Sequence, residues 1–406
     1  MTPKRILIVT NGPLCRNPRP VKEAVTLGRA GYDVTLLMVR NHAPSEPVDA
    51  ALMAEAPFRR EAVDLIPGFS TGVARLLLHR TMSRIARSAA PVIGLGGRLA
   101  IGPSAALLAR ARAIPADLTI VHNEPAHWAG IRLMSGGRRV AADIEDWHSE
   151  DLTPEARARR PLRLIRASEA GLLRRAAYVT TTSRALSGAL HDRYGGMQAQ
   201  VISNSFPLQA NPLGRETGPV PAFFWFSQTT GPGRGLELFL SAWSRTTVPS
   251  RLVILGDPVA GYPASLLARV PAERRDQVSF RPQVAPASLP AVIAEHDIGL
   301  ALEQSFIVNR DLTITNKILQ YLNAGLAVVA SPTAGQREVL AQAPEAGVIS
   351  DFMQTGEAAS ALDRLLADRA VLTGRRAAAR RLAEEVYCWE REEPRLLDLV
   401  ERAIEG

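Results

Sequence analysis

Residues 313–331 read TITNKILQYLNAGLAVVAS, and this stretch indicates a helix, a stop signal and a buried strand. Ile318 and Leu322 recur at helical spacing, and Thr315 before them can accept a backbone N–H at the helix start. Gly325 supplies the left-handed residue that ends many helices. The β-branched pair that follows predicts a parallel strand buried on both faces. The stretch is therefore typical of a sheet whose strands alternate with helices.

The start of this helix is predicted to bind an anion. Its unpaired N–H groups and its dipole point outward at the carboxyl edge of the sheet, where such folds bind ligands. Lys317 lies in the first turn, and Gln320 follows three residues later on the same face. A cation beside a hydrogen-bonding amide suits a diphosphate that is followed by a ribose.

The composition allows two domains and favours anionic partners. The chain has 406 residues, of which 46% are apolar, so that two sizeable cores can form. The formal net charge is +8, which suits phosphates, acidic lipids or nucleic acid, although the arginine excess can equally reflect genome composition. The two cysteines, Cys15 and Cys388, imply no disulfide framework and favour a reducing compartment.

The sequence predicts a cytoplasmic protein without a membrane span. The first residues, MTPKRILIVTN, have too short an apolar part for a signal peptide. The most apolar long window, residues 89–108, is interrupted by Arg98 and Pro103. Two basic helical stretches, residues 73–87 and 157–175, fit either an ordinary solvated helix face or docking at the inner face of an anionic membrane.

The first half of the chain begins with a strand, a loop containing Gly12, a helix opened by Pro20 and ended by Gly31, and a second strand. This is a βαβ unit, and the loop after the first strand is where such sheets bind ligands. Residues 44–114 indicate only several short amphipathic helices. The strands expected in this half are residues 5–10, 34–39, 118–121, 139–143, 178–181 and 200–202.

A stretch rich in Pro and Gly, residues 206–221, separates the two halves. The alternation then restarts, with strands expected at residues 222–226, 251–255, 278–280, 298–302 and 328–329 and helices at 236–243, 357–385 and 393–404. We therefore predict an α/β protein with two doubly wound parallel-sheet domains. The predicted segments are a domain of residues 1–205, a linker of 206–221, a domain of 222–385 and a C-terminal helical segment of 386–406.

A second phosphate-binding stretch is predicted at residues 227–235, SQTTGPGRG, between a strand and a helix. Gly231 and Gly233 allow close backbone approach to a phosphate, and Arg234 adds a planar fork of donors. A surface connector is the alternative. A dinucleotide fold with Asp257 on the ribose is a third interpretation, which the spacing GxGxG, in place of GxGxxG, disfavours.

If the helices after the two stretches are neighbours, Arg234 and Lys317 face one diphosphate together. His122, at the end of a first-half strand, can hydrogen-bond a sugar hydroxyl or serve only the structure. The acidic stretch DIEDWHSE, residues 143–150, contains metal-ligand types, but no Cys/His spacing supports zinc and clustered acids in a loop are usually solvated. We therefore predict no metal site. A GxSxG motif is absent from the sequence.

The two halves together resemble the GT-B glycosyltransferases, in particular the retaining family-four group. The order and spacing of several short stretches carry the resemblance more than any single motif does. The stretches that carry it are NPRPVKEAVTLGRAGYDVTLL (17–37), DLTIVHNEPAHWAG (117–130), VTTTSRAL (179–186), VISNSFP (201–207), SQTTGPGRG (227–235) and NKILQYLNAGLAVVAS (316–331).

The resemblance implies two Rossmann-like domains that face a cleft and a final helix that crosses back to the first domain. It implies transfer of a sugar, with retention, from a nucleoside diphosphate sugar to a hydroxyl acceptor, without a metal or other cofactor. Positive side chains and helix N–H groups would stabilise the leaving diphosphate. The catalytic residues expected are His122, Arg234 and Lys317, and those expected to bind the donor are Gly12, Gly231, Gly233, Asn316, Gln320 and Glu303.

The chain departs from the family pattern at the donor site. Leu312 and Gln320 stand where the family has two glutamates, and Thr229 stands where its phosphate loop has an arginine. Glu303 or Asp311 can substitute for the first glutamate. Two alternatives therefore stay open: a non-catalytic GT-B protein that binds a nucleotide or partner, and a sugar-nucleotide epimerase.

The expected reaction is hexosyl transfer in the synthesis of a cell-surface polysaccharide or glycolipid. The expected partners are a nucleotide-sugar donor, a glycan or lipid-linked acceptor and an anionic membrane surface. Nucleic acid is not expected, because the arginine-rich stretches lack interleaved aromatic residues for base stacking.

Overall fold

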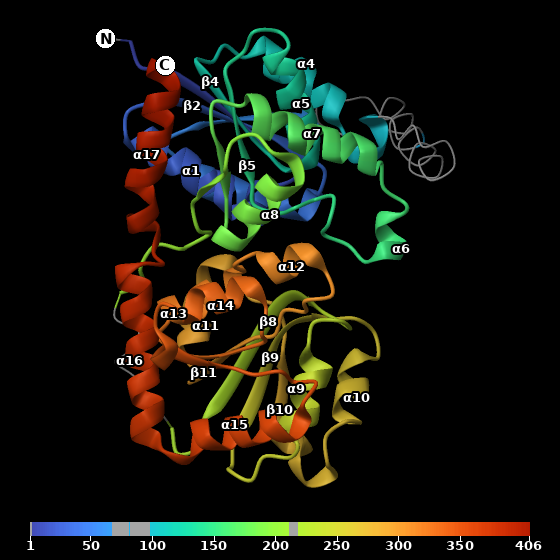
Figure 1. Ribbon diagram of the computed structural model, residues 1–406, viewed down its shortest axis with the longest axis vertical. Coiled ribbons are helices and arrows are strands. Elements are labelled where there is room, and N and C mark those ends of the chain that lie inside the picture. Colours follow the sequence, from blue (N-terminus) through green and yellow to red (C-terminus); the bar gives the residue numbers. More distant parts are fainter. Residues whose placement is uncertain (1, 67–80, 82–97, 211–217) are drawn as a thin grey trace. The chain divides into compact units, whose positions relative to one another are not determined.

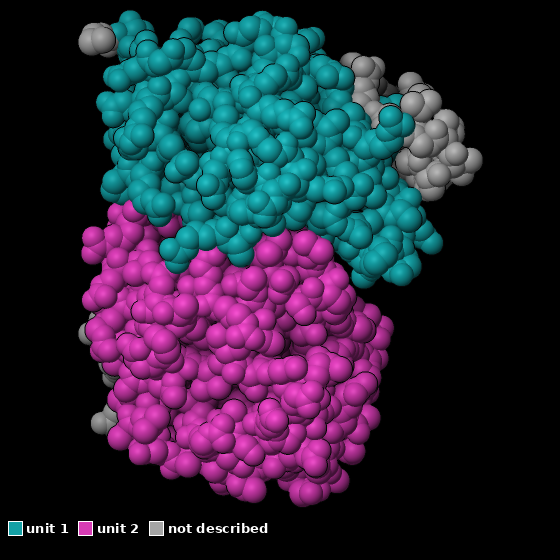
Figure 2. Space-filling model, in the orientation of Figure 1, with its two compact units in different colours: residues 1–202, 393–406 teal, residues 203–392 magenta. Residues whose placement is uncertain are grey.

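The computed structural model describes residues 2–66, 81, 98–210 and 218–406. The chain forms two compact units, which Figure 2 shows in separate colours. Unit 1 comprises Met1–Ile202 and Glu393–Gly406, and unit 2 comprises Ser203–Glu392. The division at Ile202 lies before the Pro/Gly-rich stretch predicted as the linker. The basic helix expected at residues 73–87 lies outside the described residues.

Unit 1 is built on a seven-stranded parallel sheet in the order β3-β2-β1-β4-β5-β6-β7 (Figure 1). The strands are β1 (Arg5–Val9), β2 (Asp33–Arg40), β3 (Arg59–Asp64), β4 (Leu118–His122), β5 (Val140–Ile144), β6 (Val179–Thr181) and β7 (Gln200–Val201). Apart from the exposed Arg5, the residues of the central strands β1, β4 and β5 are buried, as their largely apolar runs predict. The edge strand β3 was not predicted, because its residues RREAVD are mostly polar and only partly buried.

The helices of unit 1 are α1 (Pro18–Arg29), α2 (Glu46–Met53), α4 (Ser104–Ala113), α5 (Asn123–Met134), α6 (Pro154–Arg157), α7 (Leu162–Arg175) and α8 (Arg184–Tyr194). Ser183 caps α8 by accepting a hydrogen bond from the backbone N–H of Leu186. The basic helix predicted over residues 157–175 is confirmed from Leu162 to Arg175, which form α7. It is not continuous with α6, which ends at Arg157, and Pro161 before α7 cannot supply the N–H that a continuous helix needs.

Unit 2 repeats the arrangement with a six-stranded parallel sheet in the order β10-β9-β8-β11-β12-β13. The strands are β8 (Ala222–Thr230), β9 (Arg251–Pro258), β10 (Val278–Arg281), β11 (Ile298–Ala301), β12 (Ala327–Ala330) and β13 (Gly347–Ile349). The short β13 was not predicted. Its three residues, GVI, give too brief an apolar run to be distinguished from a loop.

The helices of unit 2 are α9 (Leu236–Trp243), α10 (Tyr262–Leu267), α11 (Leu289–Ala294), α12 (Val308–Leu312), α13 (Asn316–Asn323), α14 (Ala334–Leu340), α15 (Thr355–Ala367) and α16 (Arg369–Glu385). Helices α9, α10 and α15 pack on one face of the sheet through an apolar cluster that includes Phe239 and Leu362. The other face is covered by α11, α13, α14 and α16. The last helix, α17 (Trp389–Glu405), begins in unit 2 and continues into the C-terminal residues of unit 1.

Both sheets reverse their strand order at one point, which lies between β1 and β4 in unit 1 and between β8 and β11 in unit 2. Doubly wound sheets bind ligands outside the carboxyl ends of the strands at such a switch point. Gly12, Arg234 and Glu303 lie in the loops after β1, β8 and β11, and His122 is the last residue of β4. None of the helices in the described part of the chain is long and apolar enough to cross a membrane.

Candidate functional site

The helix α13 has the start and the end that the sequence predicted. Thr315 occupies the N-cap position, and Gly325 follows the C-cap residue with a φ of +66°. Ile318 and Leu322 are fully buried. The expected capping bond is the exception, because the Thr315 side chain accepts no hydrogen bond from the helix. At the start of α13, the hydroxyl of Thr315 and the first backbone N–H groups of the helix therefore do not hydrogen-bond to one another.

The loop between β8 and α9 is shaped by glycines. Gly233 has a φ of +75° and Gly235 a φ of +82°, which L side chains rarely adopt. A Cβ atom on Gly235 would lie 2.4 Å from the carbonyl oxygen of Leu302 and 2.7 Å from Nε2 of Gln304. The loop after β8 therefore packs its backbone directly against the loop after β11.

Lys317 and Glu303 form a buried ion pair at this place. Lys317 Nζ lies 2.6 Å from Glu303 Oε1, and also 5.9 Å from the centre of the Trp225 ring. Burial alone would raise the pKa of Glu303, but the charge of Lys317, with those of Arg310 and Arg234, holds it below its ordinary value. Three cations therefore gather around one carboxylate, and the cluster keeps an excess of positive charge.

Arg234 is a cation that is available to a ligand. It is partly exposed, and among the described residues its guanidinium has no hydrogen bond or ion pair. Arg310, which the sequence analysis missed, is partly exposed in α12. Its charge was visible in the sequence, but only the fold of the loop after β11 places it near Glu303. Asp311, considered as a substitute glutamate, accepts a hydrogen bond from the backbone N–H of Ala334.

Three buried oxygen atoms at the end of β8 and in the N-cap and body of α13 have no hydrogen-bond partner among the described residues: Oγ1 of Thr230, Oγ1 of Thr315 and Oε1 of Gln320. Each such atom costs about 1–3 kcal/mol when it stays unpaired in a folded protein. A ligand with hydroxyl groups would satisfy them. Thr230 and Thr315 were not predicted as site residues, because a lone threonine gives no signal. Gln320 and Asn316 lie on α13 and are partly exposed, whereas in the loop Gly231 is buried and Gly233 is exposed.

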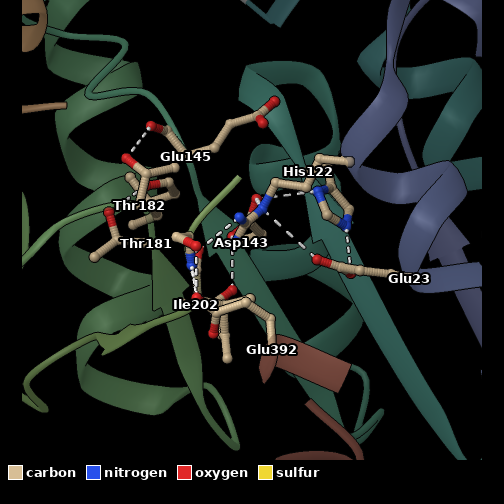
Figure 3. A network of polar contacts seen from close by, with 12 residues as sticks. Glu23, His122, Asp143, Glu145, Thr181, Thr182, Ile202 and Glu392 are labelled. Atoms are coloured by element: carbon tan, nitrogen blue, oxygen red, sulfur yellow. Dashed lines mark hydrogen bonds and ion pairs between the residues drawn. The ribbon is translucent and has the colours of Figure 1, made fainter. Parts of the chain in front are cut away.

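Unit 1 places His122 in a buried charge network (Figure 3). His122 Nε2 lies 3.0 Å from Glu23 Oε2, and Nδ1 lies 3.2 Å from Asp143 Oδ2. Burial alone would lower the pKa of His122, but the two carboxylates raise it to about 10. The imidazole is therefore charged, and both of its nitrogens face carboxylates of unit 1. The role at a sugar that the resemblance implies for His122 stays a prediction.

Arg19 completes this network. Its Nε and Nη2 donate to Asp143 at 2.8 and 2.6 Å, and its Nη1 donates to the carbonyl of Ile202 at 2.7 Å. Glu23, His122 and Asp143 bring potential metal-ligand atoms within 4.8 Å of one another. Because Arg19 and the charged imidazole already neutralise both carboxylates, a cation would have to displace one of them. These residues do not fit a metal site.

The loop after β1 and the first residue of α5 each have an unusual backbone conformation. Gly12 has a φ of +92°, and Asn123, with a φ of +57°, is the one non-glycine residue with positive φ in the described part of the chain. Asn123 Nδ2 donates to Thr10 Oγ1 at 3.0 Å, while its buried Oδ1 has no partner among the described residues. Such strain persists mainly at functional positions. Asn123 is therefore a site candidate that the sequence analysis missed.

Comparison with known proteins gives one family match. Residues 221–368 match the family model described as glycosyl transferases group 1. These residues comprise the strands of unit 2, the loops that hold Arg234 and Glu303, and the helix α13 that holds Lys317. No curated protein matches the chain in sequence.

Several solved structures share the fold over nearly the whole chain. HepE of Anabaena in complex with UDP is 15% identical, with a TM-score of 0.67, over 98% of this chain and 99% of that one. Sucrose-phosphate synthase of Thermosynechococcus elongatus is 14% identical, with a TM-score of 0.70 and 98% of each chain covered. A trehalose 6-phosphate synthase of Burkholderia multivorans is 12% identical, with a TM-score of 0.64, over 99% of this chain and 97% of that one.

Proposed function

We propose that this chain, which has the GT-B fold and a glycosyl transferases group 1 region at residues 221–368, transfers a sugar from a nucleoside diphosphate sugar to a hydroxyl acceptor. Unit 2 binds the donor and unit 1 binds the acceptor. The outcome is retention of the anomeric configuration, as the family resemblance implies. No metal takes part, and the transferred sugar is a hexose.

The observation that carries the proposal is the excess positive charge at the start of α13. Arg234 has no partner among the described residues, and Lys317 faces the same carboxylate as Arg234 does. When the bond between the sugar and the diphosphate breaks, negative charge grows on the leaving phosphate. Fixed cations and helix N–H groups stabilise that charge more in the transition state than in the bound donor.

The unpaired atoms of unit 2 support a nucleotide beside these cations. Oγ1 of Thr315 and Oε1 of Gln320 lie on the helix whose start binds the diphosphate, and they can accept hydrogen bonds from ribose hydroxyls. HepE is described in complexes with UDP and with UDP-glucose. We therefore propose a UDP-sugar as the first donor to test.

The acceptor is proposed to be a glycan or a lipid-linked sugar in the synthesis of a cell-surface polysaccharide or glycolipid. Four exposed arginines on and beside α6 and α7 support docking to an anionic membrane from the cytoplasmic side: Arg159, Arg163, Arg174 and Arg175. Failure to bind vesicles rich in acidic lipid at low salt would remove the membrane from the proposal.

The test of the proposed function is release of UDP from UDP-glucose by the wild-type protein and by the variant Arg234→Ala. Loss of one positioned donor to a developing oxyanion lowers kcat by roughly 10²–10³-fold. We expect a loss of that size with an unchanged melting temperature, because Arg234 is partly exposed and makes no bond that holds the fold. Equal rates in the two proteins would contradict the role of Arg234.

The same experiment separates the two alternatives. A non-catalytic nucleotide-binding protein would bind UDP but release none from any sugar nucleotide in a panel. An epimerase would convert one sugar nucleotide into another or free the altered sugar, which product analysis by NMR detects.

A further inference from the structure

Two asparagines of unit 1 have buried amide oxygens without a partner. Oδ1 of Asn11, in the loop after β1, and Oδ1 of Asn123, the first residue of α5, accept no hydrogen bond from the described residues. Strands β1 and β4 are parallel neighbours with Val9 opposite Val121, and each asparagine lies two residues beyond this pair. Both therefore lie at the switch point of the unit 1 sheet, where doubly wound sheets bind ligands.

The orientation of the Asn123 amide is fixed by a chain of hydrogen bonds. Asn17 Nδ2 lies 3.2 Å from the carbonyl oxygen of Asn11 and 2.6 Å from that of Pro13, so this atom must be a donor nitrogen. Asn17 Oδ1 then accepts from Thr10 Oγ1 at 3.5 Å, and Thr10 Oγ1 in turn accepts from Asn123 Nδ2 at 3.0 Å. Asn123 Oδ1 is therefore an acceptor, and it cannot exchange places with the amide nitrogen.

Asn123 also has a backbone conformation that costs energy. Its φ of +57° is one that asparagine tolerates better than most residues but seldom adopts. Its unpaired buried oxygen adds a desolvation cost. The hydrogen bond to Thr10 offsets part of these costs, and a ligand that donates to Oδ1 would offset more. Two such costs at one residue favour a role in binding over a role in folding alone.

The two amide oxygens select the chemistry of a ligand. An amide oxygen only accepts hydrogen bonds, so the ligand must supply donor hydrogens. A carboxylate, or a phosphate at neutral pH, presents mainly acceptor oxygens and would leave the amide oxygens unpaired. The neighbouring His122 does not attract an anion to this place, because both of its nitrogens already face carboxylates. The hydroxyl groups of a sugar supply the donors without charge.

We propose that Asn123 and Asn11 form a subsite of unit 1 that binds the hydroxyl groups of an uncharged sugar, the acceptor of the proposed reaction. Oδ1 of each asparagine accepts one sugar O–H. The inference rests on the proposed function and narrows its acceptor class: unit 1 recognises the glycan itself, not a phosphate that links the glycan to a lipid. Thr10 is a positioning residue, because it acts by holding the Asn123 amide in place.

The test measures the binding of four neutral sugars by saturation-transfer NMR: the methyl glycosides of glucose, galactose, mannose and N-acetylglucosamine. Asn123→Gly removes the amide, and glycine adopts a φ of +57° without strain, so this variant should fold. Asn41→Gly changes an exposed asparagine elsewhere in unit 1 and is the matched control. Calorimetry with UDP, which binds unit 2 under the proposed function, tests that function separately.

We expect at least one glycoside to bind wild type and Asn41→Gly equally. Asn123→Gly should bind it roughly 2- to 10-fold more weakly, the effect of one neutral hydrogen bond, and should bind UDP as wild type does. Equal glycoside binding by wild type and Asn123→Gly would overturn the subsite. So would a wild type that binds UDP but none of the four glycosides. A wild type that binds a glycoside through Asn123 but does not bind UDP would overturn the proposed function instead.

A second comparison separates contact with the sugar from a merely structural role. Thr10→Val removes the hydroxyl that holds the Asn123 amide, whereas Thr10→Ser keeps it. Glycoside binding should weaken in Thr10→Val and match wild type in Thr10→Ser, with UDP binding unchanged in both.

Monodeoxy analogues of the bound glycoside then identify the hydroxyl that Asn123 contacts. The analogue that lacks this hydroxyl should bind wild type more weakly than the parent glycoside does, but should bind Asn123→Gly as well as the parent does. The same loss in both proteins for every analogue would contradict a direct contact.

Discussion

Lys317 and Glu303 show, at the scale of single residues, how unit 2 holds a positive charge in place for a ligand. The distance of 2.6 Å between Nζ and Oε1 fixes the ammonium group, and the surrounding protein excludes most of the water. One carboxylate does not neutralise three cations, so the pair orients Lys317 without cancelling the site's charge. The sequence indicated each of these residues, but it could not show that Glu303 is bound to Lys317 and not free for a sugar hydroxyl.

Lys317→Ala is predicted to lower both stability and UDP affinity, because it leaves Glu303 buried without a counterion. Breaking a buried pair in this way costs about 3–5 kcal/mol. The double variant Lys317→Ala with Glu303→Gln should regain most of that stability but none of the UDP affinity. Urea unfolding and calorimetric titration with UDP measure the two effects separately. Recovery of UDP binding in the double variant would show that Lys317 acts only through the fold.

The raised pKa of His122 should make the stability of the protein depend on pH. Its pKa is about 10 in the folded protein and 6.5 in an unfolded chain, so its contribution is fully present below pH 6.5 and is lost as the pH rises to 10. The free energy of unfolding should fall across this range. His122→Gln should be less stable at pH 6 and should show a flatter decline, whereas the exposed His191→Gln should behave as wild type. Parallel declines in wild type and His122→Gln would contradict the charged imidazole.

Asn123 marks the limit of prediction from single residues. The resemblance drew attention to its neighbour His122, which the structure places inside the charge network. The backbone strain at Asn123 follows from how α5 starts immediately after β4. Asparagine tolerates a positive φ better than most residues, but the sequence alone gives no reason to expect one here.

The loop between β8 and α9 illustrates the scale of elements. The pattern SQTTGPGRG predicted a turn that brings backbone close to a phosphate, and the positive φ values of Gly233 and Gly235 agree with such a turn. The elements missed by the sequence analysis, β3 and β13, lack a long apolar run, since one is polar and the other is three residues long. Long apolar runs therefore predicted the central strands, and the edge strands β3 and β13 were missed because they lack such runs.

Gly235→Ala is predicted to disturb this loop. The added Cβ would lie 2.4 Å from the carbonyl oxygen of Leu302, and the φ of +82° is unfavourable for alanine. We expect the free energy of unfolding to fall by about 1–3 kcal/mol and the affinity for UDP to decrease. Gly374→Ala is the matched control, since this helical glycine has open space around it and alanine should stabilise α16 by about 1 kcal/mol. Equal UDP affinity in Gly235→Ala and wild type would show that the loop does not position the phosphate.

At the scale of the whole molecule, the two units share one strand order around their switch points. The sequence predicted two doubly wound sheets, though not their strand order, because strands and helices alternate in each half and a Pro/Gly-rich stretch interrupts them. The chain passes from unit 1 to unit 2 after Ile202 and returns after Glu392. Arg19 holds the carbonyl of Ile202 within unit 1, and Ser203 bonds to Glu392 within unit 2. These polar anchors link residues far apart in the chain, so periodicity could not reveal them.

The central claim is that Arg234 and Lys317 bind one diphosphate, and UDP calorimetry against uridine tests it most directly. Arg234→Ala removes a charged donor worth about 1.5–3 kcal/mol, and should therefore weaken UDP binding by roughly 10- to 100-fold while leaving uridine binding unchanged. Arg251→Ala, an exposed arginine at the start of β9, should bind both ligands as wild type does. The same UDP affinity in Arg234→Ala and wild type, or an equal loss for uridine, would contradict the account.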